Sequence, residues 1–493
     1  MFIRGEPARI TMRQAHIQER RFYNVVTAIL NWRLLNLSEG SPAMKLEKHS
    51  LSILEEAIER MEEGFATLPD VSAEYDGERL QSVLLQVATR MQDNYPYFHP
   101  QYAGQMLKPP HPVARIAYML AMWVNPNNHA LDGGRASSRM EKEAVAEIAR
   151  MFGWDTHLGH LTSGGTMANL EALFVSGKLN PGKKVVASEQ AHYTHSRISD
   201  VLKLEFEAIP CDRQARMDPN ALEDRLKKGD VGTVVATVGT TGAGAVDPLP
   251  ALLDLREKYG FRLHADAAYG GYFVLVDNLP VETAESYRRL SEVDSLVIDP
   301  HKHGLQPYGC GCVLFKDPAV GVFYKHDSPY TYFTSSELHL GEISLECSRA
   351  GASAVALWAT QQMLPMTRDG EFARGLAKCR QAAVDLHGRL ENDPRFLTMF
   401  EPELDIVIFA ASGASSRSIS TASKQLFDQT ATNDLHLALF SYPSAMLRDI
   451  WTDVEFTDQT VTCLRSCLMK PEHADWMDRI WMILSNALHP VSR

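Results

Sequence analysis

The sequence has 493 residues, which is too long for one small hydrophobic core and predicts two or three structural units. Hydrophobic residues make up 45% and charged residues 22%, the composition of a soluble globular protein. The formal net charge of −12 argues against a nucleic-acid-binding surface, so no nucleic-acid partner is expected.

No feature of the sequence predicts secretion or a membrane partner. The first residues lack the apolar core of a signal peptide, and the longest apolar-rich stretch, 114–124, is far shorter than the roughly 20 residues that span a bilayer. The seven cysteines show no metal-ligand spacing with histidine, so no metal site is predicted. Their odd number suits free thiols in a reducing compartment. We therefore expect a cytoplasmic protein.

Residues 1–90 are expected to form a helical N-terminal arm. Apolar residues recur there on one face of a helix, at Leu51, Leu54, Ile58 and Met61. Residues 91–135 are rich in tyrosine, proline, histidine and asparagine, which favours rigid loops. A helix over 141–152 is expected to follow.

From about residue 155 to 315, short β-branched runs alternate with helical segments. This alternation predicts an α/β domain around a largely parallel sheet, whose active residues gather at the ends of strands. The predicted strands are 184–188, 232–238, 261–266, 295–299 and 311–315, and one of the helices between them is 248–259.

A second, α+β unit is expected beyond about residue 370. It begins with a long helix and continues with strands and helices that alternate less regularly. The predicted helices are 371–391, 418–427 and 474–488, and the predicted strands are 405–411, 435–442 and 460–468.

One predicted buried strand ends in Asp299-Pro-His-Lys302-His-Gly304. A lysine in a pocket that disfavours its charge becomes a nucleophile and forms Schiff bases with carbonyl compounds. A solvated lysine at the exit of a strand is the simpler interpretation. Three other stretches decide between the two.

The first of these is the segment 262–271, which places an acid, Asp266, in an otherwise apolar strand pattern. A buried carboxylate needs a cationic partner, and the protonated ring nitrogen of pyridoxal phosphate is such a partner. Ala268 points to the same face of the strand, where its methyl group can lie under an aromatic ring.

The second stretch is a glycine-rich turn before a predicted helix, 167–178, with Thr166 as its N-cap. Gly164 and Gly165 expose backbone N–H groups there, which favours a phosphate site, although such turns are also common without a ligand. The third stretch contains His192, after the strand 184–188. This histidine could stack on the other face of the ring, although a single histidine is more often structural.

In chain order these are a phosphate turn, a stacking histidine, a strand aspartate and a strand-end lysine. With these residues the chain resembles the group II pyridoxal-phosphate-dependent amino-acid decarboxylases, which include the aromatic-amino-acid, tyrosine and glutamate decarboxylases. The matching sequences are TSGGTMANLEAL at 162–173, TVGTTGAGAVDPL at 237–249, HADAAYGG at 264–271 and DPHKHG at 299–304. The direct resemblance spans roughly residues 90–360.

The resemblance implies the α/β fold-type I scaffold, with a mostly parallel seven-stranded sheet flanked by helices. It also implies three domains: the helical arm (1–90), a large pyridoxal-phosphate-binding domain (91–369) and a small α+β domain (370–493). In this family the N-terminal segment packs across a second subunit, so a homodimer with shared active sites is expected.

The resemblance also implies a role for each site residue. Lys302 would hold pyridoxal phosphate, Asp266 would keep its ring nitrogen protonated, and His192 and Ala268 would enclose its ring. The phosphate is expected at Gly165, Thr166 and His301. Thr240 is expected to bind the cofactor or the substrate carboxylate.

Related decarboxylases close a loop whose tyrosine protonates the carbon that carbon dioxide has left. Tyr324, Tyr330 and Tyr332 are the candidates here, and spacing from Arg349 favours Tyr324. Asp299 stands where many relatives have asparagine or serine. Because an anion would repel a phosphate, Asp299 is not expected to be a phosphate ligand.

The predicted function is therefore pyridoxal-phosphate-dependent decarboxylation of an L-amino acid, a small-molecule substrate, with an aromatic amino acid such as tyrosine favoured. The alternatives are decarboxylation of glutamate or aspartate, and an aldehyde lyase or aminotransferase on the same scaffold. A catalytically silent cofactor-binding scaffold is the third alternative, and it would require that Lys302 and Asp266 no longer have a catalytic function.

Overall fold

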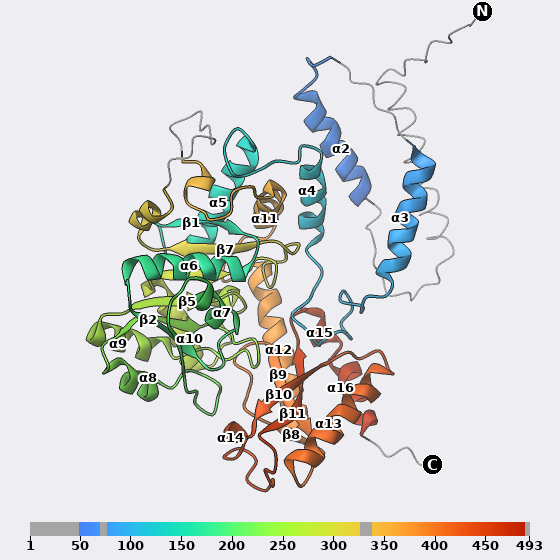
Figure 1. Cartoon of the computed structure of the whole chain (residues 1–493). Helices are drawn as coiled ribbons and strands as arrows, with labels where there is room; N and C mark the ends of the chain where they lie inside the picture. Colours follow the sequence, from blue (N-terminus) through green and yellow to red (C-terminus); the bar gives the residue numbers. More distant parts are fainter. Residues whose placement is uncertain (1–48, 70–75, 326–337, 489–493) are drawn as a thin grey trace, which may run out of the picture. The chain divides into compact units, whose positions relative to one another are not determined.

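The computed structural model describes residues 49–69, 76–325 and 338–488. The chain divides into two compact units, Met1–His99 and Pro100–Arg493. Figure 1 shows the order of the helices and strands along the chain. Within the described residues, no helix is both long and apolar enough to cross a membrane.

The first unit contains two amphipathic helices, α2 (Ser50–Glu63) and α3 (Gly77–Met91). The side chain of Asp76 caps α3 by accepting a hydrogen bond of 3.0 Å from the backbone N–H of Arg79. No residue of α3 is buried. These helices confirm the helical character predicted for this region, except for residues 1–48 and 70–75, which lie outside the described parts.

A seven-stranded sheet forms the core of the second unit, in the order β1-β7-β6-β5-β4-β2-β3 (Figure 1). β7 is antiparallel to both of its neighbours, and every other neighbouring pair is parallel. The predicted mostly parallel seven-stranded sheet is therefore confirmed. Its strands are β1 (Leu158–Thr162), β2 (Lys184–Ser188), β3 (Phe206–Ile209), β4 (Val231–Thr237), β5 (Arg262–Asp266), β6 (Ser295–Ile298) and β7 (Gly311–Phe315).

Both faces of this sheet are covered. On one face, Val297 of β6 and Val313 of β7 pack against Ala168 and Ala172 of helix α6 (Gly165–Leu179). On the other face, Leu296 and its neighbours join a large core that includes helix α5 (Arg135–Met151). Every residue of β4, β6 and β7 is buried, as expected for central strands with helices on both sides.

The helices of the second unit largely follow the prediction. α5 begins six residues before the predicted helix, and α6 begins two residues before its predicted start. The helices are α4 (Pro112–Met122), α5 (Arg135–Met151), α6 (Gly165–Leu179), α7 (Thr194–Val201), α8 (Pro219–Leu226), α9 (Leu249–Tyr259), α10 (Val281–Arg288), α11 (Gly351–Met363), α12 (Glu371–Glu391), α13 (Ser416–Ala431), α14 (Ser444–Leu447), α15 (Glu472–Asp475) and α16 (Met477–Ala487).

A four-stranded antiparallel sheet, in the order β10-β11-β9-β8, lies in the C-terminal part of the chain (orange to red in Figure 1). Leu386 of α12 and Ile480 of α16 pack with Phe409 of β9 in one hydrophobic core. The predicted α+β character of this region is confirmed. The strands are β8 (Phe396–Thr398), β9 (Ile406–Ala411), β10 (Ala438–Pro443) and β11 (Thr460–Cys467).

Candidate active site

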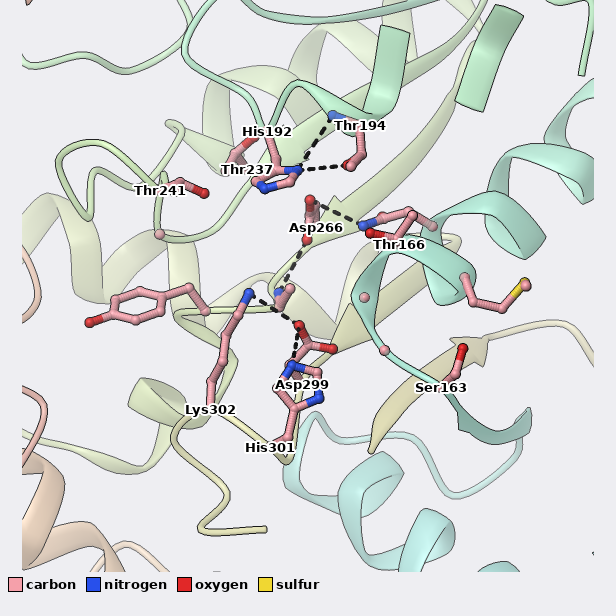
Figure 2. A pocket seen from close by; sticks show the side chains of 17 residues that line it. Ser163, Thr166, His192, Thr194, Thr237, Thr241, Asp266, Asp299, His301 and Lys302 are labelled. Atoms are coloured by element: carbon pink, nitrogen blue, oxygen red, sulfur yellow. Dashed lines mark hydrogen bonds and ion pairs between the residues drawn. The ribbon is translucent and has the colours of Figure 1, made fainter. Parts of the chain in front are cut away.

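The segments that follow five parallel strands enclose a cavity of about 340 Å³ (Figure 2). The carboxyl ends of parallel strands meet at one edge of a sheet, which brings together residues far apart in the sequence. The volume lies within the range of about 300–1,000 Å³ that is typical of small-molecule sites. The cavity is lined by Ser163–Met167, Asn169, His192, Thr194, Thr237, Gly239, Thr241, Asp266, Ala268, Tyr269, Asp299, His301 and Lys302.

Lys302 enters the cavity from the loop after β6. Its Nζ lies 3.1 Å from Oδ2 of Asp299, whose side chain is almost completely buried. The backbone N–H of Lys302 also donates a hydrogen bond of 2.9 Å to the backbone carbonyl of Asp299. The lysine is therefore attached to Asp299 through both its backbone and its amine, and the amine is held at the cavity wall.

Asp266, the last residue of β5, is buried and receives three hydrogen bonds. Oδ2 accepts from His195 Nε2 at 2.8 Å and from Asn169 Nδ2 at 3.3 Å, and Oδ1 accepts from the backbone N–H of Ala268 at 3.2 Å. Burial alone would raise the pKa of this carboxyl. The hydrogen bond from His195 and the charges of His195 and Lys302 instead hold the pKa of Asp266 below its ordinary value. The carboxylate therefore remains ionised.

His195 and Asn169 are site residues that the sequence analysis missed. Asn169 lies three residues after Thr166 on α6, so helical spacing was a usable signal for Asn169. His195 lies on α7, but His192 precedes this helix, so helical spacing gave no such signal for His195. Burial lowers the pKa of His264 to about 3, so this ring is neutral. His264 Nε2 lies 2.9 Å from Asn169 Oδ1. This contact turns the amide nitrogen of Asn169 towards the carboxylate.

His192 and Ala268 line the cavity after β2 and β5. His192 Nδ1 lies 2.7 Å from Thr194 Oγ1, and its ring stacks at 4.6 Å on the ring of Tyr193. Burial lowers the pKa of His192, and the negative charge of Asp266 opposes this effect only in part. A neutral, flat ring therefore faces the cavity.

The turn after β1 places the N-terminus of α6 against the cavity. The helix begins at Gly165, and Gly164 is its N-cap with a φ of 156°, a conformation that side chains rarely adopt. The prediction that Thr166 is the N-cap is therefore wrong, because Thr166 is already inside the helix. The first N–H groups of a helix have no carbonyl partner within it and attract anions.

His301 lies between this turn and Lys302. Its ring stacks at 4.7 Å on Tyr308, and Nε2 is 3.5 Å from Oδ2 of Asp299. Burial lowers the pKa of His301. His301 Nδ1 and Asp299 Oδ1 are buried polar atoms without a hydrogen-bond partner among the described residues. Buried polar atoms are normally satisfied, so these two are consistent with a ligand in the cavity.

The structure does not bring Thr240 to the cavity. Its hydroxyl is fully buried and accepts hydrogen bonds from the backbone N–H groups of Ala245 at 3.0 Å and Ala243 at 3.4 Å. The neighbouring Thr241 lines the cavity instead. The carbonyl of Thr241 accepts a hydrogen bond of 2.9 Å from Arg465, which ties this turn to β11.

Tyr324 also lies away from the residues that line the cavity. Its ring contacts Phe174 and Phe315, at centroid distances of 5.9 and 6.4 Å. Burial raises the pKa of Tyr324, and the charge of Glu171 and a hydrogen bond to Glu171 raise it further. The other two candidates, Tyr330 and Tyr332, lie outside the described residues.

Sequence comparisons identify relatives of this chain. Residues 64–412 match the family described as "Pyridoxal-dependent decarboxylase conserved domain". The chain is 28% identical over 412 residues to L-tyrosine decarboxylase of Enterococcus faecium, covering 62% of this chain and 67% of that protein. It is 28% identical over 338 residues to L-aspartate decarboxylase of Thermococcus kodakarensis, covering 68% and 85%. It is 34% identical over 259 residues to a probable L-aspartate decarboxylase of Halobacterium salinarum, covering 52% and 70%.

Solved structures share the fold. The crystal structure of mouse CSAD superposes with a TM-score of 0.71 at 20% identity, covering 88% of this chain and 91% of that chain. The structure of Oryza sativa TDC with PLP and tryptamine gives a TM-score of 0.71 at 15% identity, covering 95% and 98%. At these identities the likeness concerns the fold alone.

Proposed function

The chain belongs to the pyridoxal-dependent decarboxylase family, and from this premise we propose that its cavity decarboxylates an aromatic L-amino acid such as tyrosine. The chain is a fold-type I carboxy-lyase that acts on amino acids, and its cofactor is pyridoxal phosphate. One observation carries the assignment of the site. Lys302, Asp266 and the N-terminus of α6 converge on a single cavity.

The residues of this cavity fit pyridoxal phosphate. The N-terminus of α6, at Gly165 and Thr166, suits its phosphate, and the ionised carboxylate of Asp266 suits its protonated ring nitrogen. The neutral ring of His192 and the methyl group of Ala268 suit its two faces. When bound, the cofactor accepts the electron pair left by departing carbon dioxide.

The protein residues hold charge and orientation for this reaction. Asp266 keeps a negative charge inside the protein because His195 and Asn169 donate hydrogen bonds to it. Lys302 supplies the amine that holds the cofactor, and Asp299 keeps this amine at the cavity wall. His301 contributes a second polar group next to the phosphate turn. The tyrosine that would return a proton is assigned to the segment of Tyr324, Tyr330 and Tyr332, as a proposal from the family resemblance alone.

The charges of the cavity support an aromatic substrate. Lys302 is the only lysine or arginine among the described residues that line it. An acidic side chain taken out of water needs a cationic partner, whereas an aromatic side chain does not. Because relatives named for L-aspartate match this chain as well as those named for L-tyrosine, aspartate is the second candidate.

We also propose a cytoplasmic homodimer with shared active sites. The apolar face of α3 supports the dimer, because Val83, Leu84, Val87 and Met91 are 48–63% exposed and such faces gain stability from burial. All seven cysteines lie within the described residues and are free, which supports a reducing compartment.

The direct test is carbon dioxide release by the cofactor-loaded protein from each L-amino acid in turn. We expect release from tyrosine or another aromatic amino acid, and none in Lys302→Ala. A matched control is Lys316→Ala, because Lys316 is exposed and follows β7 outside the cavity. Release from aspartate alone would replace the aromatic substrate, and keto-acid or aldehyde products without carbon dioxide would contradict decarboxylation at this site.

A further inference from the structure

The residue after Lys302 is more deeply buried than Lys302 itself. His303 is fully buried, and its ring packs edge-on against Tyr269 at 4.8 Å and Phe273 at 5.0 Å. Its Nε2 lies 3.3 Å from Oδ2 of Asp405. Neither of these two atoms has a hydrogen-bond partner among the described residues, and their separation makes each an available polar neighbour of the other.

Asp405 reaches this histidine from a distant part of the chain. It directly precedes β9 and is fully buried, and its backbone carbonyl accepts a hydrogen bond of 2.8 Å from Leu468. Its Oδ1 accepts a hydrogen bond of 2.6 Å from the hydroxyl of Tyr269. The carboxylate therefore touches Tyr269 with one oxygen and His303 with the other.

Tyr269 connects this contact to the cavity, because it lines the cavity and directly follows Ala268. His303 connects it to Lys302 through a single peptide bond. The buried carboxylate of Asp405 thus links Tyr269, which lines the cavity beside Ala268, to His303, which directly follows Lys302. Burial raises the pKa of Asp405 to about 6, while the hydrogen bond from Tyr269 and the charge of Lys108 oppose this shift.

Lys302 is consequently held from two directions. Asp299 binds its amine at 3.1 Å, and the Tyr269–Asp405–His303 cluster fixes the backbone position from which the side chain starts. A misplacement of about 1 Å at a reacting group is enough to lower a rate by about a hundredfold. The backbone anchor therefore matters for chemistry as well as for packing.

We propose that Tyr269, Asp405 and His303 are positioning residues that place Lys302 for covalent attachment to the cofactor. This inference rests on the proposed function of the cavity. In the attachment step the ammonium group of Lys302 would first give a proton to water, its nitrogen would then add to the aldehyde carbon to form a carbon–nitrogen double bond, and the aldehyde oxygen would leave as one water molecule. Within the described residues the side chains of the cluster make no hydrogen bond to the turn before α6, so we expect the cluster to act on this step and not on phosphate binding.

The test compares two binding events in the full-length protein freed of cofactor. The first is the rate at which the visible absorbance of the covalent product appears after pyridoxal phosphate is added. The second is the affinity for 4-deoxypyridoxine phosphate, which lacks the aldehyde and binds without a covalent bond. The variants are Tyr269→Phe and Asp405→Asn.

The matched control is Glu403→Gln. Glu403 is also a buried carboxylate, two residues from Asp405, but it accepts hydrogen bonds from Thr283 at 2.9 Å and Val246 at 3.2 Å and has no contact with Tyr269 or His303. We expect the attachment rate to fall about tenfold or more in both test variants, with the affinity for the aldehyde-free analogue almost unchanged. The control should alter neither quantity.

Two results would overturn the inference. One is an unchanged attachment rate in a folded Asp405→Asn variant. The other is an equal loss of rate and analogue affinity, which would indicate a general structural role. If Asp405→Asn does not fold, His303→Gln decides the question on the same two criteria, because it leaves the bond between Tyr269 and Asp405 in place. A wild-type protein that never acquires the absorbance would instead refute the proposed function.

Discussion

The amine of Lys302 and the carboxylate of Asp299 form a 3.1 Å ion pair at the wall of the cavity, beside the turn that begins α6. This pairing puts a negative charge close to the expected phosphate position. Asp299→Asn removes that charge and leaves the ammonium group of Lys302 without its partner. We expect the variant to bind 4-deoxypyridoxine phosphate about threefold to tenfold more tightly, measured by calorimetry, because one repulsion of about 1 kcal/mol is lost. Weaker binding would show that Asp299 supports the ligand.

Gly165 allows Asp299 to approach the start of α6. A Cβ atom at this position would lie 2.7 Å from Oδ2 of Asp299, which is buried and cannot move freely. Gly165→Ala should therefore weaken cofactor binding about tenfold or more, by displacing either the turn or the carboxylate. Gly388→Ala is the control, because that helical position has no atom within 4 Å of the new methyl group. Equal affinities for the two variants would contradict the crowding argument.

The hydrogen bond from His195 keeps the pKa of Asp266 low, so its removal should change the pH dependence of activity. In His195→Phe the effect of burial is less opposed, and the pKa of Asp266 rises. Because the carboxylate is needed in its charged form, activity should be lost at a higher pH than in the wild type as the pH falls. A pH profile of carbon dioxide release tests this. If the acid side of the pH profile does not move, the hydrogen bonds from Asn169 and Ala268 are enough to keep the pKa of Asp266 low.

Asp247 makes a separate prediction about stability. Burial raises its pKa to about 7, against the backbone hydrogen bonds from Met217 and Thr237. A carboxyl whose pKa is higher in the folded state contributes stability below its unfolded value, near 4, and loses it as the pH rises towards 7. Asp247→Asn does not titrate. The difference in unfolding free energy between the wild type and the variant should therefore fall by about 2 kcal/mol between about pH 5 and 7, because each pH unit in this range changes it by about 1.4 kcal/mol. Urea unfolding of both proteins at these two pH values measures this change. An equal difference between the two proteins at both pH values would refute the prediction.

The exposed apolar face of α3 predicts the oligomeric state. Leu84→Glu places a charge on this face, where the native side chain is 54% exposed. We expect light scattering to show a dimer for the wild type and a larger monomer fraction for the variant. Val281→Glu is the control, since Val281 is 79% exposed at the start of α10. A dimer equally stable in both variants would exclude α3 from the interface.

Most of the sheet could be predicted from local sequence, and the exceptions have a physical reason. β2 and β7 agree with their predicted bounds because they consist of short apolar runs that end in turns. β1 and β3 were missed because Gly159, His160 and Glu207 interrupt the apolar pattern. His160 is nevertheless accommodated by a 2.9 Å contact with the buried Glu171, a partner that only the folded chain provides.

The sequence pattern identified residues of the cavity wall where a single strand end supplies one residue, but it missed the contacts between distant segments. Lys302, Asp266, His192, Ala268, Gly165, Thr166 and His301 all line the cavity. The contacts of Asp266 with His195 and of His303 with Asp405 join elements that no spacing rule connects. Thr240 and Thr241 follow Gly239, whose φ of 96° ends the extended strand, so the alternation of a strand does not predict which of the two threonines lines the cavity.

β7, the one strand of the seven-stranded sheet that runs antiparallel to its neighbours, separates two strands that lead into the cavity. β7 separates β1, which leads into the phosphate turn, from β6, which leads into the lysine loop, so these two strands are two inter-strand spacings, or about 10 Å, apart. Its first residue, Gly311, packs so closely on Gly164 that a methyl group there would meet the backbone at 2.6 Å. β7 thus keeps β1 and β6 apart. A scaffold that paired β1 directly with β6 would halve this gap and leave less room between the turn before α6 and the loop of Lys302.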